Sequence, residues 1–379
     1  MTTIADIERA RALLHGIAHR TPLLRSSTLS TRVGTQLAVK AEHLQRTGSF
    51  KIRGAYVRIT SMDPPRPVVA ASAGNHAQGV AWAARAHGVA CTVVMPTYAS
   101  LAKIEATRGY GAIVDLHGDT FEDSLLRARE IADSTGATLI HAFDDPDVIA
   151  GQGTVGAEIC EDAPDAQRVV VPVGGGGLAA GVAVAVKSLR PEIRVIGVRP
   201  ASSPDTIADG AAVAAFGTHT APLLASHVDE IIAVDDEVIS QAILAHLEVM
   251  KQVVEGAGAL PLAAMLSGAI EPGGETVLIC SGGNIDPGLL MRVIRHGLAE
   301  AGRYLFVRIV LEDRPGRLQA VLALLAELKV NVLSVTHHRA GHALPVGGVE
   351  VELTVETRDR AHADEVVAAL VGAGYQVGR

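Results

Sequence analysis

The segment Lys40–Ala55, KAEHLQRTGSFKIRGA, places one lysine where a helix is expected to begin. Thr47 and Ser49 are of the residue types that cap helix N-termini, and Gly48 permits a tight turn ahead of the helix. Lys51 would then lie in the first helical turn, where the helix dipole disfavours a cation. A Schiff base between Lys51 and an anionic cofactor removes much of that objection. Taken alone, the segment also fits an exposed lysine after a turn.

A second candidate segment, Ser72–Gly79, reads SAGNHAQG and follows a predicted strand at residues 67–71. Its small residues leave backbone N–H groups exposed at the start of the next helix, which suits a carboxylate. Asn75 adds a side chain that can both donate and accept a hydrogen bond. An ordinary strand-to-helix turn capped by Asn75 would look the same, so this segment alone leaves both interpretations open.

Four consecutive glycines, Gly174–Gly177, precede Leu178 between another predicted strand and helix. Glycine lets successive backbone N–H groups converge on one anion, and the helix dipole adds to the attraction. The run lacks the Lys-Ser/Thr pair of a P-loop and the spacing of a dinucleotide fingerprint, so a phosphate monoester suits it better. Close packing of helix on strand is the alternative. A fourth segment, Cys280–Asn284 (CSGGN), offers Ser281 as a hydrogen-bond partner for a ring nitrogen.

The elements that would position these segments alternate in type from about residue 37 to residue 300. Short β-branched runs predict strands at residues 37–42, 67–71, 90–95, 111–115, 138–141, 168–173, 193–198 and 276–280. Helical patterns lie between them, among others at residues 75–87, 119–134, 177–189 and 236–249. This alternation predicts an α/β fold with mostly parallel sheets, in which ligands bind beyond the carboxyl ends of the strands.

The pattern changes near residue 303. Strands at residues 304–311, 330–339, 348–356 and 375–377 and helices at 314–328 and 361–372 are predicted in the order βαββαβ. That order in so short a segment is a complete small domain of the ferredoxin-like type. We therefore expect two domains, residues 1–302 and 303–379, with a smaller lobe at about residues 42–145 inserted in the first.

Composition excludes several classes of protein. Hydrophobic residues make up 48% of the 379-residue chain, the formal net charge is -8, and no basic run occurs, so nucleic acid is not an expected partner. The uncharged stretch 169–186 is long enough to span a membrane, but Pro172 and four glycines interrupt it. We expect a strand, a turn and a helix there, in a soluble protein with no membrane partner. Three widely spaced cysteines and no signal peptide fit a reducing, cytoplasmic compartment.

Together, KAEHLQRTGSFKIRGA, SAGNHAQG, the glycine run and CSGGN resemble the threonine dehydratases (threonine ammonia-lyases). These belong to the larger family of pyridoxal 5'-phosphate (PLP) enzymes that share the tryptophan synthase β-subunit fold, PLP fold type II. The resemblance covers nearly the whole chain. It implies a two-lobed α/β catalytic region, PLP as the cofactor and a small-molecule amino acid as the substrate.

The resemblance also implies roles for individual residues. Lys51 would bind PLP, with Phe50 beside it, and Asn75 would contact the 3′-oxygen of the cofactor. Ser281 would be the partner of the pyridine nitrogen, and the loop from Ser72 to His76 would hold the substrate carboxylate. The phosphate would lie on the glycine loop, Gly174, Gly175, Gly176, Gly177 and Leu178. The implied catalytic residues are therefore Lys51, Ser72 and Asn75.

The implied reaction is α,β-elimination from L-threonine, giving 2-oxobutanoate and ammonia, with L-serine as a poorer substrate. Lys51 would remove the α-proton, for which its amine must be neutral, although an ordinary lysine has a pKa of about 10.4. Burial would lower that pKa. A serine dehydratase or racemase is the alternative within the same fold. An amino-acid sensor that keeps PLP only as structure is the alternative of another class.

The C-terminal domain resembles the ACT domains, which bind amino acids, through the motif Asp313-Arg314-Pro315-Gly316-Arg317-Leu318. Pro315 suits the first helical turn, and Gly316 lets a ligand approach the backbone. Isoleucine or valine is the expected effector, and a dimerisation module without a ligand is the alternative. ACT domains commonly pair between chains, so a homodimer or homotetramer is expected. Isoleucine biosynthesis and threonine breakdown both remain open.

The chain departs from the family pattern at one position. Relatives often carry an acidic residue after the strand at residues 193–198, where it contributes to a cation site, and here Arg199 stands there. A cationic side chain cannot ligate a metal, so no metal ion is expected. Glu158 and Glu255 remain candidates for a monovalent-ion or structural role, with surface or ion-paired carboxylates as the plainer interpretation.

Overall fold

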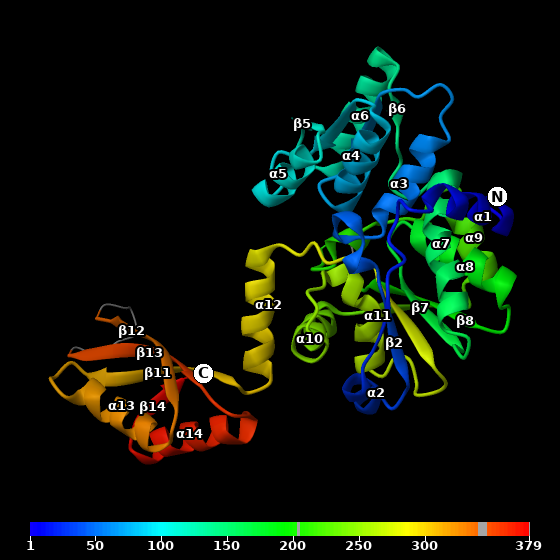
Figure 1. Cartoon of the computed structure of the whole chain (residues 1–379). Coiled ribbons are helices and arrows are strands. Elements are labelled where there is room, and N and C mark those ends of the chain that lie inside the picture. The colour runs from blue at the N-terminus through cyan, green and yellow to red at the C-terminus, as the bar shows by residue number, and fades with distance from the viewer. Residues whose placement is uncertain (203–204, 340–346, 379) are drawn as a thin grey trace. The chain divides into compact units, whose positions relative to one another are not determined.

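The computed structural model describes residues 1–202, 205–339 and 347–378 of the chain. The chain divides into two compact units, Met1–Leu289 and Leu290–Arg379, each with its own sheet structure and core (Figure 1). The sequence-based boundary at residues 302 and 303, and the limits of the inserted lobe, stay predictions.

The larger sheet of the first unit has six strands in the order β1-β2-β10-β7-β8-β9. β1 is antiparallel to β2, and the other neighbouring pairs are parallel. Parallel strands covered on both faces consist of continuous apolar runs, and β10 and nearly all of β7 are buried in this way. The strands are β1 (Leu23–Arg25), β2 (Leu37–Ala41), β7 (Arg168–Pro172), β8 (Arg194–Pro200), β9 (Glu230–Val234) and β10 (Thr276–Cys280).

A second, wholly parallel sheet lies in the same unit, with the order β5-β4-β3-β6. Its strands are β3 (Val68–Ala71), β4 (Cys91–Met95), β5 (Ile113–Leu116) and β6 (Thr138–Leu139). Helices α4 (Asn75–His87), α5 (Leu101–Gly109) and α6 (Phe121–Thr135) belong to this part of the chain (Figure 1). All four strands come from residues 68–139, a segment that lies between β2 and β7 of the larger sheet along the chain.

The remaining helices of the first unit pack mainly around the larger sheet. They are α1 (Ile4–Leu14), α2 (Ser27–Val33), α3 (Lys51–Thr60), α7 (Pro146–Asp162), α8 (Gly177–Leu189), α9 (Thr220–His227), α10 (Asp236–Ala245) and α11 (Gly256–Leu266). α7 and α8 approach so closely that a Cβ on Gly156 would lie 2.8 Å from the carbonyl oxygen of Val182. Glycine is therefore required where these two helices cross. Their contact fixes the orientation of α8, the helix that follows the glycine loop.

A buried ion network ties α3 to β2 and α7. The guanidinium of Arg53, whose residue is 1% exposed, donates to both Glu42 oxygens at 2.8 and 2.9 Å and to both Glu158 oxygens at 2.6 and 3.0 Å. Lys40 Nζ lies 2.7 Å from Glu158. Burial alone would raise the pKa of Glu42, but Arg53 and then Thr21 and Lys40 lower it below its ordinary value of 4.5. Glu42 therefore stays ionised, and the contacts of Arg53 with Glu42 and Glu158 hold the first turns of α3 in place.

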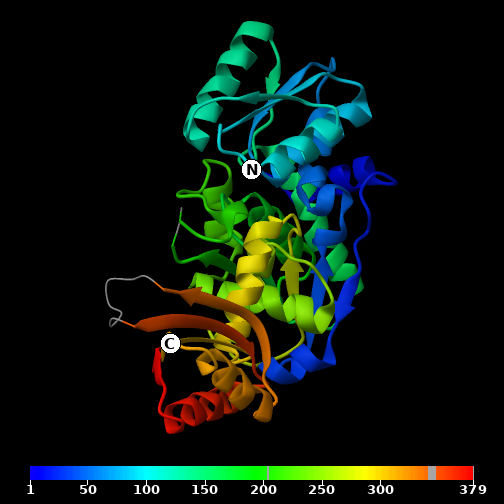
Figure 2. The same ribbon diagram turned by 90° about the vertical axis from the view of Figure 1, so that its left-hand side faces the viewer.

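The second unit contains most of α12, from Leu290 onward, and a four-stranded antiparallel sheet in the order β12-β13-β11-β14. Its elements are α12 (Pro287–Glu300), β11 (Tyr304–Glu312), α13 (Arg317–Glu327), β12 (Asn331–His338), β13 (Gly348–Glu356), α14 (Arg360–Gly372) and β14 (Gln376–Gly378). Alternate residues of β11 and β13 are buried against α13 and α14, which cover one face of the sheet (Figure 2). The predicted βαββαβ domain is confirmed.

The predicted α/β alternation is also confirmed, with two informative differences. β1 and β9 were not predicted, because β1 has three residues and β9 is largely exposed. The helix predicted at residues 236–249 is α10 followed by a π-helical segment, His246–Met250. Its helical periodicity was visible in the sequence, whereas the change in helix type was not.

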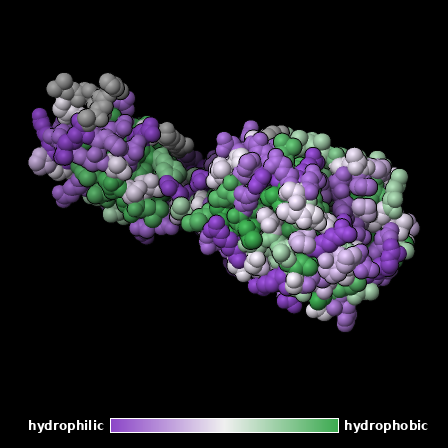
Figure 3. All heavy atoms as spheres, turned by 90° about the horizontal axis from the view of Figure 1, so that it is seen from above, coloured by the Kyte–Doolittle hydropathy of each residue, from purple (hydrophilic) through white to green (hydrophobic). Residues whose placement is uncertain are grey.

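The uncharged stretch at residues 169–186 lies in β7, the glycine turn and α8, as predicted. Among the described residues, none of the helices is long and apolar enough to cross a membrane. Figure 3 shows hydrophilic and hydrophobic residues interspersed in small patches on the face that it draws.

Replacing Arg53 by Met should lower the free energy of unfolding by roughly 3–5 kcal/mol at pH 7, because Glu42 and Glu158 would lose their buried partner. Urea denaturation measures this change. Arg127→Met is the matched control, since Arg127 pairs with Asp115 and Glu130 at the surface and its loss should change stability far less than the loss of Arg53.

The stabilities of the wild type and of Arg53→Met should also depend differently on pH. The low folded-state pKa of Glu42 gives the wild type stability that is present above the unfolded value of 4.5 and is lost as the pH falls through the folded-state pKa. The stability difference between wild type and Arg53→Met should therefore shrink below about pH 4.5. An equal difference at pH 7 and pH 3.5 would contradict this assignment.

Candidate active site

Lys51 is the first residue of α3, which places it in the first helical turn as predicted. The predicted capping is wrong: the N-cap is Phe50, and the hydroxyls of Thr47 and Ser49 are buried without a hydrogen-bond partner in the described structure. The reason lies in the turn, because Thr47 and Gly48 adopt φ of 61° and 73° and Ser49 is extended. Ser49 pairs instead with Gly282 through the backbone, and the helix begins after it.

The amine of Lys51 has few polar neighbours. Its Nζ donates to the carbonyl oxygen of Ala142 at 2.8 Å and lies 5.2 Å from the centre of the Phe50 ring. Burial lowers the pKa of Lys51 from 10.5 to about 8, against the opposing effect of Glu255. Burial and the nearby Lys51 lower the pKa of His76 to about 3, so this histidine is neutral. A large fraction of the Lys51 amine is therefore neutral just above physiological pH.

The segments that carry chemistry meet around Lys51. The N–H of Phe50 donates to the carbonyl oxygen of Ser281 at 3.2 Å, which joins the lysine turn to the CSGGN segment. A Cβ on Gly79 would lie 3.1 Å from the Lys51 Cβ, so α4 packs directly on the start of α3. Asn75, the first residue of α4, has its Nδ2 2.6 Å from Glu255 Oε1. Three of the four segments are thus within contact of one another.

The glycine loop, Gly174–Gly177, joins β7 to α8. Gly176 is the N-cap of α8 with φ of 96°, a conformation that favours glycine. A Cβ on Gly177 would lie 2.9 Å from Phe143, so the segment after β6 packs against this loop. Thr220 Oγ1 donates to the carbonyl oxygen of Gly175 at 2.8 Å and holds the loop from the other side.

The glycine loop has the unused donors that a phosphate requires. The backbone N–H groups from Gly174 to Leu178 make no hydrogen bond to any described residue, and they lie at the start of α8. Converging N–H groups at a helix N-terminus bind an anion. The residues present therefore fit pyridoxal phosphate: the loop would hold the phosphate and Lys51 the reactive carbon, while the cofactor would supply an electron sink.

The two serines of the prediction have different surroundings. Ser72 follows β3, and its Oγ accepts from the N–H of Gly74 at 3.1 Å, which shapes the turn before α4. Ser281 follows β10 and is 2% exposed, and its hydroxyl has no hydrogen-bond partner among the described residues. That hydroxyl is free for a ring nitrogen. The roles assigned to Phe50, Lys51, Ser72, Asn75, Ser281 and the glycine loop stay predictions.

Sequence reasoning missed the segment after β6 and the asparagine that ends CSGGN. Ala142 accepts from Lys51, and the Asp144 carboxylate accepts the N–H groups of residues 218, 219 and 220 at 2.7–3.2 Å, which fixes the turn that supports the glycine loop. Asn284 Nδ2 donates to Asn75 Oδ1 at 2.8 Å. Residues 141–145 lie at and after the end of a predicted strand, where α/β folds bind ligands, and the sequence analysis did not use this position to identify them.

The two glutamates considered from the sequence have distinct surroundings. Glu158 belongs to the ion network of Arg53, in agreement with the ion-paired interpretation. Glu255 is 4% exposed and lies among the active-site segments, where burial and Asp209 raise its pKa to about 7. The Arg199 guanidinium lies 5.8 Å from the Phe216 ring. That no metal binds stays a prediction.

A hollow of about 570 Å³ lies elsewhere, at the amino-terminal ends of β7 and β8, and is lined among others by Arg168, Arg190 and Arg194. These arginines already have partners. Arg168 donates to two carbonyl oxygens and a threonine hydroxyl, while Arg190 and Arg194 pair with Glu192 and Glu230. Parallel sheets bind ligands at their carboxyl ends, so the site around Lys51 is the better candidate.

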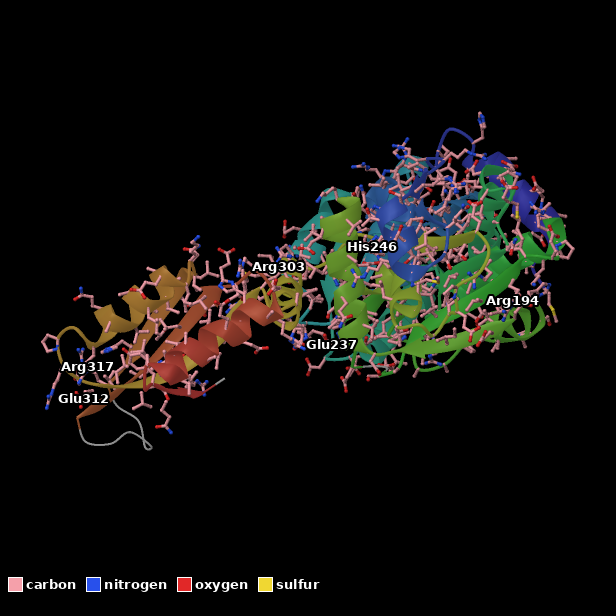
Figure 4. The ribbon with its side chains drawn as sticks, turned by 90° about the horizontal axis from the view of Figure 1, so that it is seen from below. Arg194, Glu237, His246, Arg303, Glu312 and Arg317 are labelled. Carbon is pink, nitrogen blue, oxygen red and sulfur yellow. The ribbon has the colours of Figure 1, made fainter. Side chains whose placement is uncertain are left out.

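The predicted effector motif joins β11 to α13 in the second unit. α13 begins at Arg317 with Gly316 as N-cap, so the prediction that Pro315 lies in the first helical turn is wrong. The φ of 88° at Gly316 interrupts the helical conformation between them. Glu312 and Arg317 lie side by side, 2.6 Å apart (Figure 4), and Asp313 pairs with Arg339 at 3.1 Å.

Comparison with known proteins adds independent findings. A family model described as pyridoxal-phosphate dependent enzyme matches residues 15–282, and an ACT domain model matches residues 306–372. L-threonine ammonia-lyase of Thermotoga maritima is 47% identical over 100% of this chain and 99% of its own. The solved T.th. threonine deaminase is 43% identical over 75% of this chain and 99% of its own, with a TM-score of 0.72. Maize serine racemase is 34% identical over 79% and 98%, with a TM-score of 0.73.

Protein stripped of cofactor should react with pyridoxal phosphate at a rate that rises with pH, with a midpoint near 8, because only the neutral Lys51 amine attacks the aldehyde. At pH 7 the neutral fraction would exceed that of an ordinary lysine by more than about a hundredfold. Stopped-flow absorbance of the lysine-bound cofactor measures this rate. Lys51→Ala provides the background, and a midpoint above pH 10 would contradict the buried amine.

Proposed function

The chain belongs to the pyridoxal-phosphate dependent enzyme family, and from this premise we propose that it is a threonine ammonia-lyase that converts L-threonine to 2-oxobutanoate and ammonia. The observation that carries the proposal is the arrangement at Lys51. The Lys51 amine, with a pKa of about 8, donates to Ala142, and the next residue, Phe143, packs against a glycine loop whose N–H groups have no partner among the described residues. L-threonine ammonia-lyase of Thermotoga maritima is 47% identical along the whole chain.

The residues divide the work of elimination among them. Pyridoxal phosphate, when bound, supplies the electron sink. Lys51 would hold the cofactor, and its amine, when free and neutral, would be the base that removes the proton from the substrate Cα. The turn from Ser72 to His76 presents N–H groups at the start of α4 to the substrate carboxylate. The β-hydroxyl takes a proton from a nearby acid and leaves as water, and addition of water to the remaining imino acid then releases ammonia and the 2-oxo acid. We propose L-serine as a poorer substrate of the same site.

Racemisation of serine is the second candidate, because maize serine racemase has a TM-score of 0.73 with this chain at 34% identity. A racemase needs proton transfer at both faces of Cα, whereas elimination needs one base and a leaving group. Threonine is our preferred substrate because both the threonine ammonia-lyase and the threonine deaminase have higher identity to this chain.

We also infer a regulated, oligomeric enzyme. The second unit has the ACT fold, and the turn at Asp313–Leu318 is the place where we propose that isoleucine or valine binds. Pairing of ACT domains between chains supports a homodimer or homotetramer. The three free cysteines support a cytoplasmic location, because such thiols persist in reducing compartments.

Wild-type protein supplied with pyridoxal phosphate should form 2-oxobutanoate from L-threonine, and Lys51→Ala should reduce kcat by at least about a thousandfold, since both the cofactor link and the base are lost. Coupled reduction of the 2-oxo acid measures this rate. Lys329→Ala, in the second unit, is the control and should retain wild-type turnover. Wild-type protein that binds the cofactor but releases no 2-oxo acid would contradict the proposal.

Serine distinguishes the two candidates. We expect pyruvate from L-serine at a kcat/KM lower than that for threonine, and no D-serine. Chiral chromatography of the reaction mixture measures the enantiomer directly. Accumulation of D-serine faster than pyruvate would favour the racemase.

Isoleucine or valine should change the threonine saturation curve, and Asp313→Ala should weaken effector binding by about tenfold without changing turnover in the absence of effector. Titration calorimetry on the full chain measures the affinity. Arg358→Ala, at an exposed position two residues before α14, is the matched control. Absence of heat from both amino acids would contradict the effector proposal and favour a dimerisation module.

A further inference from the structure

We propose that Glu255 and Asn284 are positioning residues that fix the side-chain amide of Asn75, so that it can offer the cofactor only an N–H donor. The inference rests on the proposed function, because it takes Asn75 as the residue that contacts the cofactor's ring oxygen. Neither Glu255 nor Asn284 needs to touch the cofactor. They act through Asn75, which lies between them at the start of α4.

The direction of every hydrogen bond in this chain of groups follows from one carbonyl. The backbone oxygen of Thr47 can only accept, so the Asn284 atom 2.7 Å from it is the amide nitrogen. That nitrogen also donates to Asn75 at 2.8 Å, so the Asn75 atom that accepts is Oδ1. The opposite Asn75 atom is then Nδ2, which donates to Glu255 Oε1 at 2.6 Å. These three hydrogen bonds form one chain with a fixed direction, which we call the relay. It runs from the Thr47 carbonyl through the amides of Asn284 and Asn75 to the Glu255 carboxylate.

Glycines provide the space for this relay. A Cβ on Gly282 would overlap with Glu255 Oε1 and would lie 3.0 Å from Asn75 Nδ2. A Cβ on Gly48, whose φ is 73°, would overlap with the Asn284 amide. The glycines of the lysine turn and of CSGGN therefore allow the two amides and the carboxylate to meet. Backbone bonds brace the same place, because Gly283 donates to Gly48 at 2.9 Å and Glu255 donates to Gly282 at 3.1 Å.

Counting hydrogens shows what the relay leaves over. An asparagine amide has two N–H groups and one acceptor oxygen. Glu255 takes one N–H of Asn75, and Asn284 fixes the position of its oxygen by a single hydrogen bond, so the nitrogen keeps one unused N–H. Rotation of the amide by 180° would set its oxygen against the Glu255 carboxylate and its nitrogen against the Asn284 nitrogen, two unfavourable contacts in a buried site. The remaining N–H is thus a fixed donor, suited to an ionised ring oxygen.

Burial makes this arrangement matter for binding. Glu255 is 4% exposed, and a carboxylate removed from water requires the hydrogen bond from Asn75. The pKa of Glu255 is raised to about 7 by burial and Asp209, and the bond from Asn75 opposes that rise. The carboxylate and the amide therefore stabilise each other, and the site is organised before the cofactor arrives.

The decisive variant is Asn284→Asp, which keeps the shape and removes the donor. A carboxylate at position 284 would accept where it must donate, so the Asn75 amide would turn and present its oxygen to the cofactor. We expect the dissociation constant of pyridoxal phosphate to rise about tenfold or more. The lysine-bound cofactor should keep its proton to a higher pH, because its ring oxygen has lost a hydrogen-bond donor. Its absorbance band should change at that higher pH. Fluorescence titration and pH-dependent absorbance measure both effects.

Two further variants separate positioning from general structure. Glu255→Gln keeps an acceptor toward Asn75 and should bind the cofactor within about threefold of wild type, whereas Glu255→Ala should lose about tenfold. In an Asn75→Ala background, Asn284→Asp should have little further effect on affinity or spectrum, because its action passes through Asn75. Asn331→Asp, at an exposed site that pairs with Glu356 in the second unit, is the control.

Wild-type affinity and spectrum in folded Asn284→Asp, verified by circular dichroism, would overturn the inference. An equal loss in the Asn75→Ala background would also overturn it. If Asn284→Asp fails to fold, the comparison of Glu255→Gln with Glu255→Ala decides, and equal affinities for these two would count against the relay. These readouts do not depend on turnover, so an enzyme that binds the cofactor but leaves threonine unchanged would refute the proposed function alone.

Discussion

Arg53 has almost no exposure to water, and much of the first unit depends on how its charge is satisfied. An isolated guanidinium could not be buried at tolerable cost, so carboxylates from two other elements must meet it. Glu42 follows β2 and Glu158 lies on α7. Because Arg53 is two residues beyond Lys51, the same contacts fix where α3 and Lys51 begin. The side chains that stabilise the first unit thus also set the position of the lysine to which we assign the chemistry.

Around Lys51 the structure follows the opposite principle, since polar groups there are left without partners. Among the residues that the structure describes, the N–H groups of the glycine loop and the hydroxyl of Ser281 have no hydrogen-bond partner, while Asn75 is bonded to both Asn284 and Glu255. Buried polar groups normally find partners, so a cluster of unsatisfied ones marks a place for a ligand. The ion network of Arg53, whose polar groups are paired, therefore has a structural role, whereas the site around Lys51, only a few residues away, has polar groups available for a ligand.

The sequence alone predicted most of the strands and the position of Lys51 in the first turn of a helix, because each rests on local pattern or residue type. It could not predict that Thr47 and Ser49 would fail to cap α3, since that depends on backbone pairing between Ser49 and Gly282, far apart in the chain. The role of Asn284 was hidden for the same reason: its partners, Thr47 and Asn75, lie more than 200 positions away. Contacts between distant loops are absent from periodicity and capping rules.

The free donors of the glycine loop have a consequence for handling the protein. The five adjacent N–H groups from Gly174 to Leu178, at the start of α8, should attract any small tetrahedral oxyanion. They have no preference for the phosphate of the cofactor over inorganic phosphate. Inorganic phosphate or sulfate in a purification buffer should therefore compete with pyridoxal phosphate for binding to the glycine loop. Protein prepared in such buffers will be under-loaded, and its measured specific activity will reflect the history of the sample as well as the enzyme.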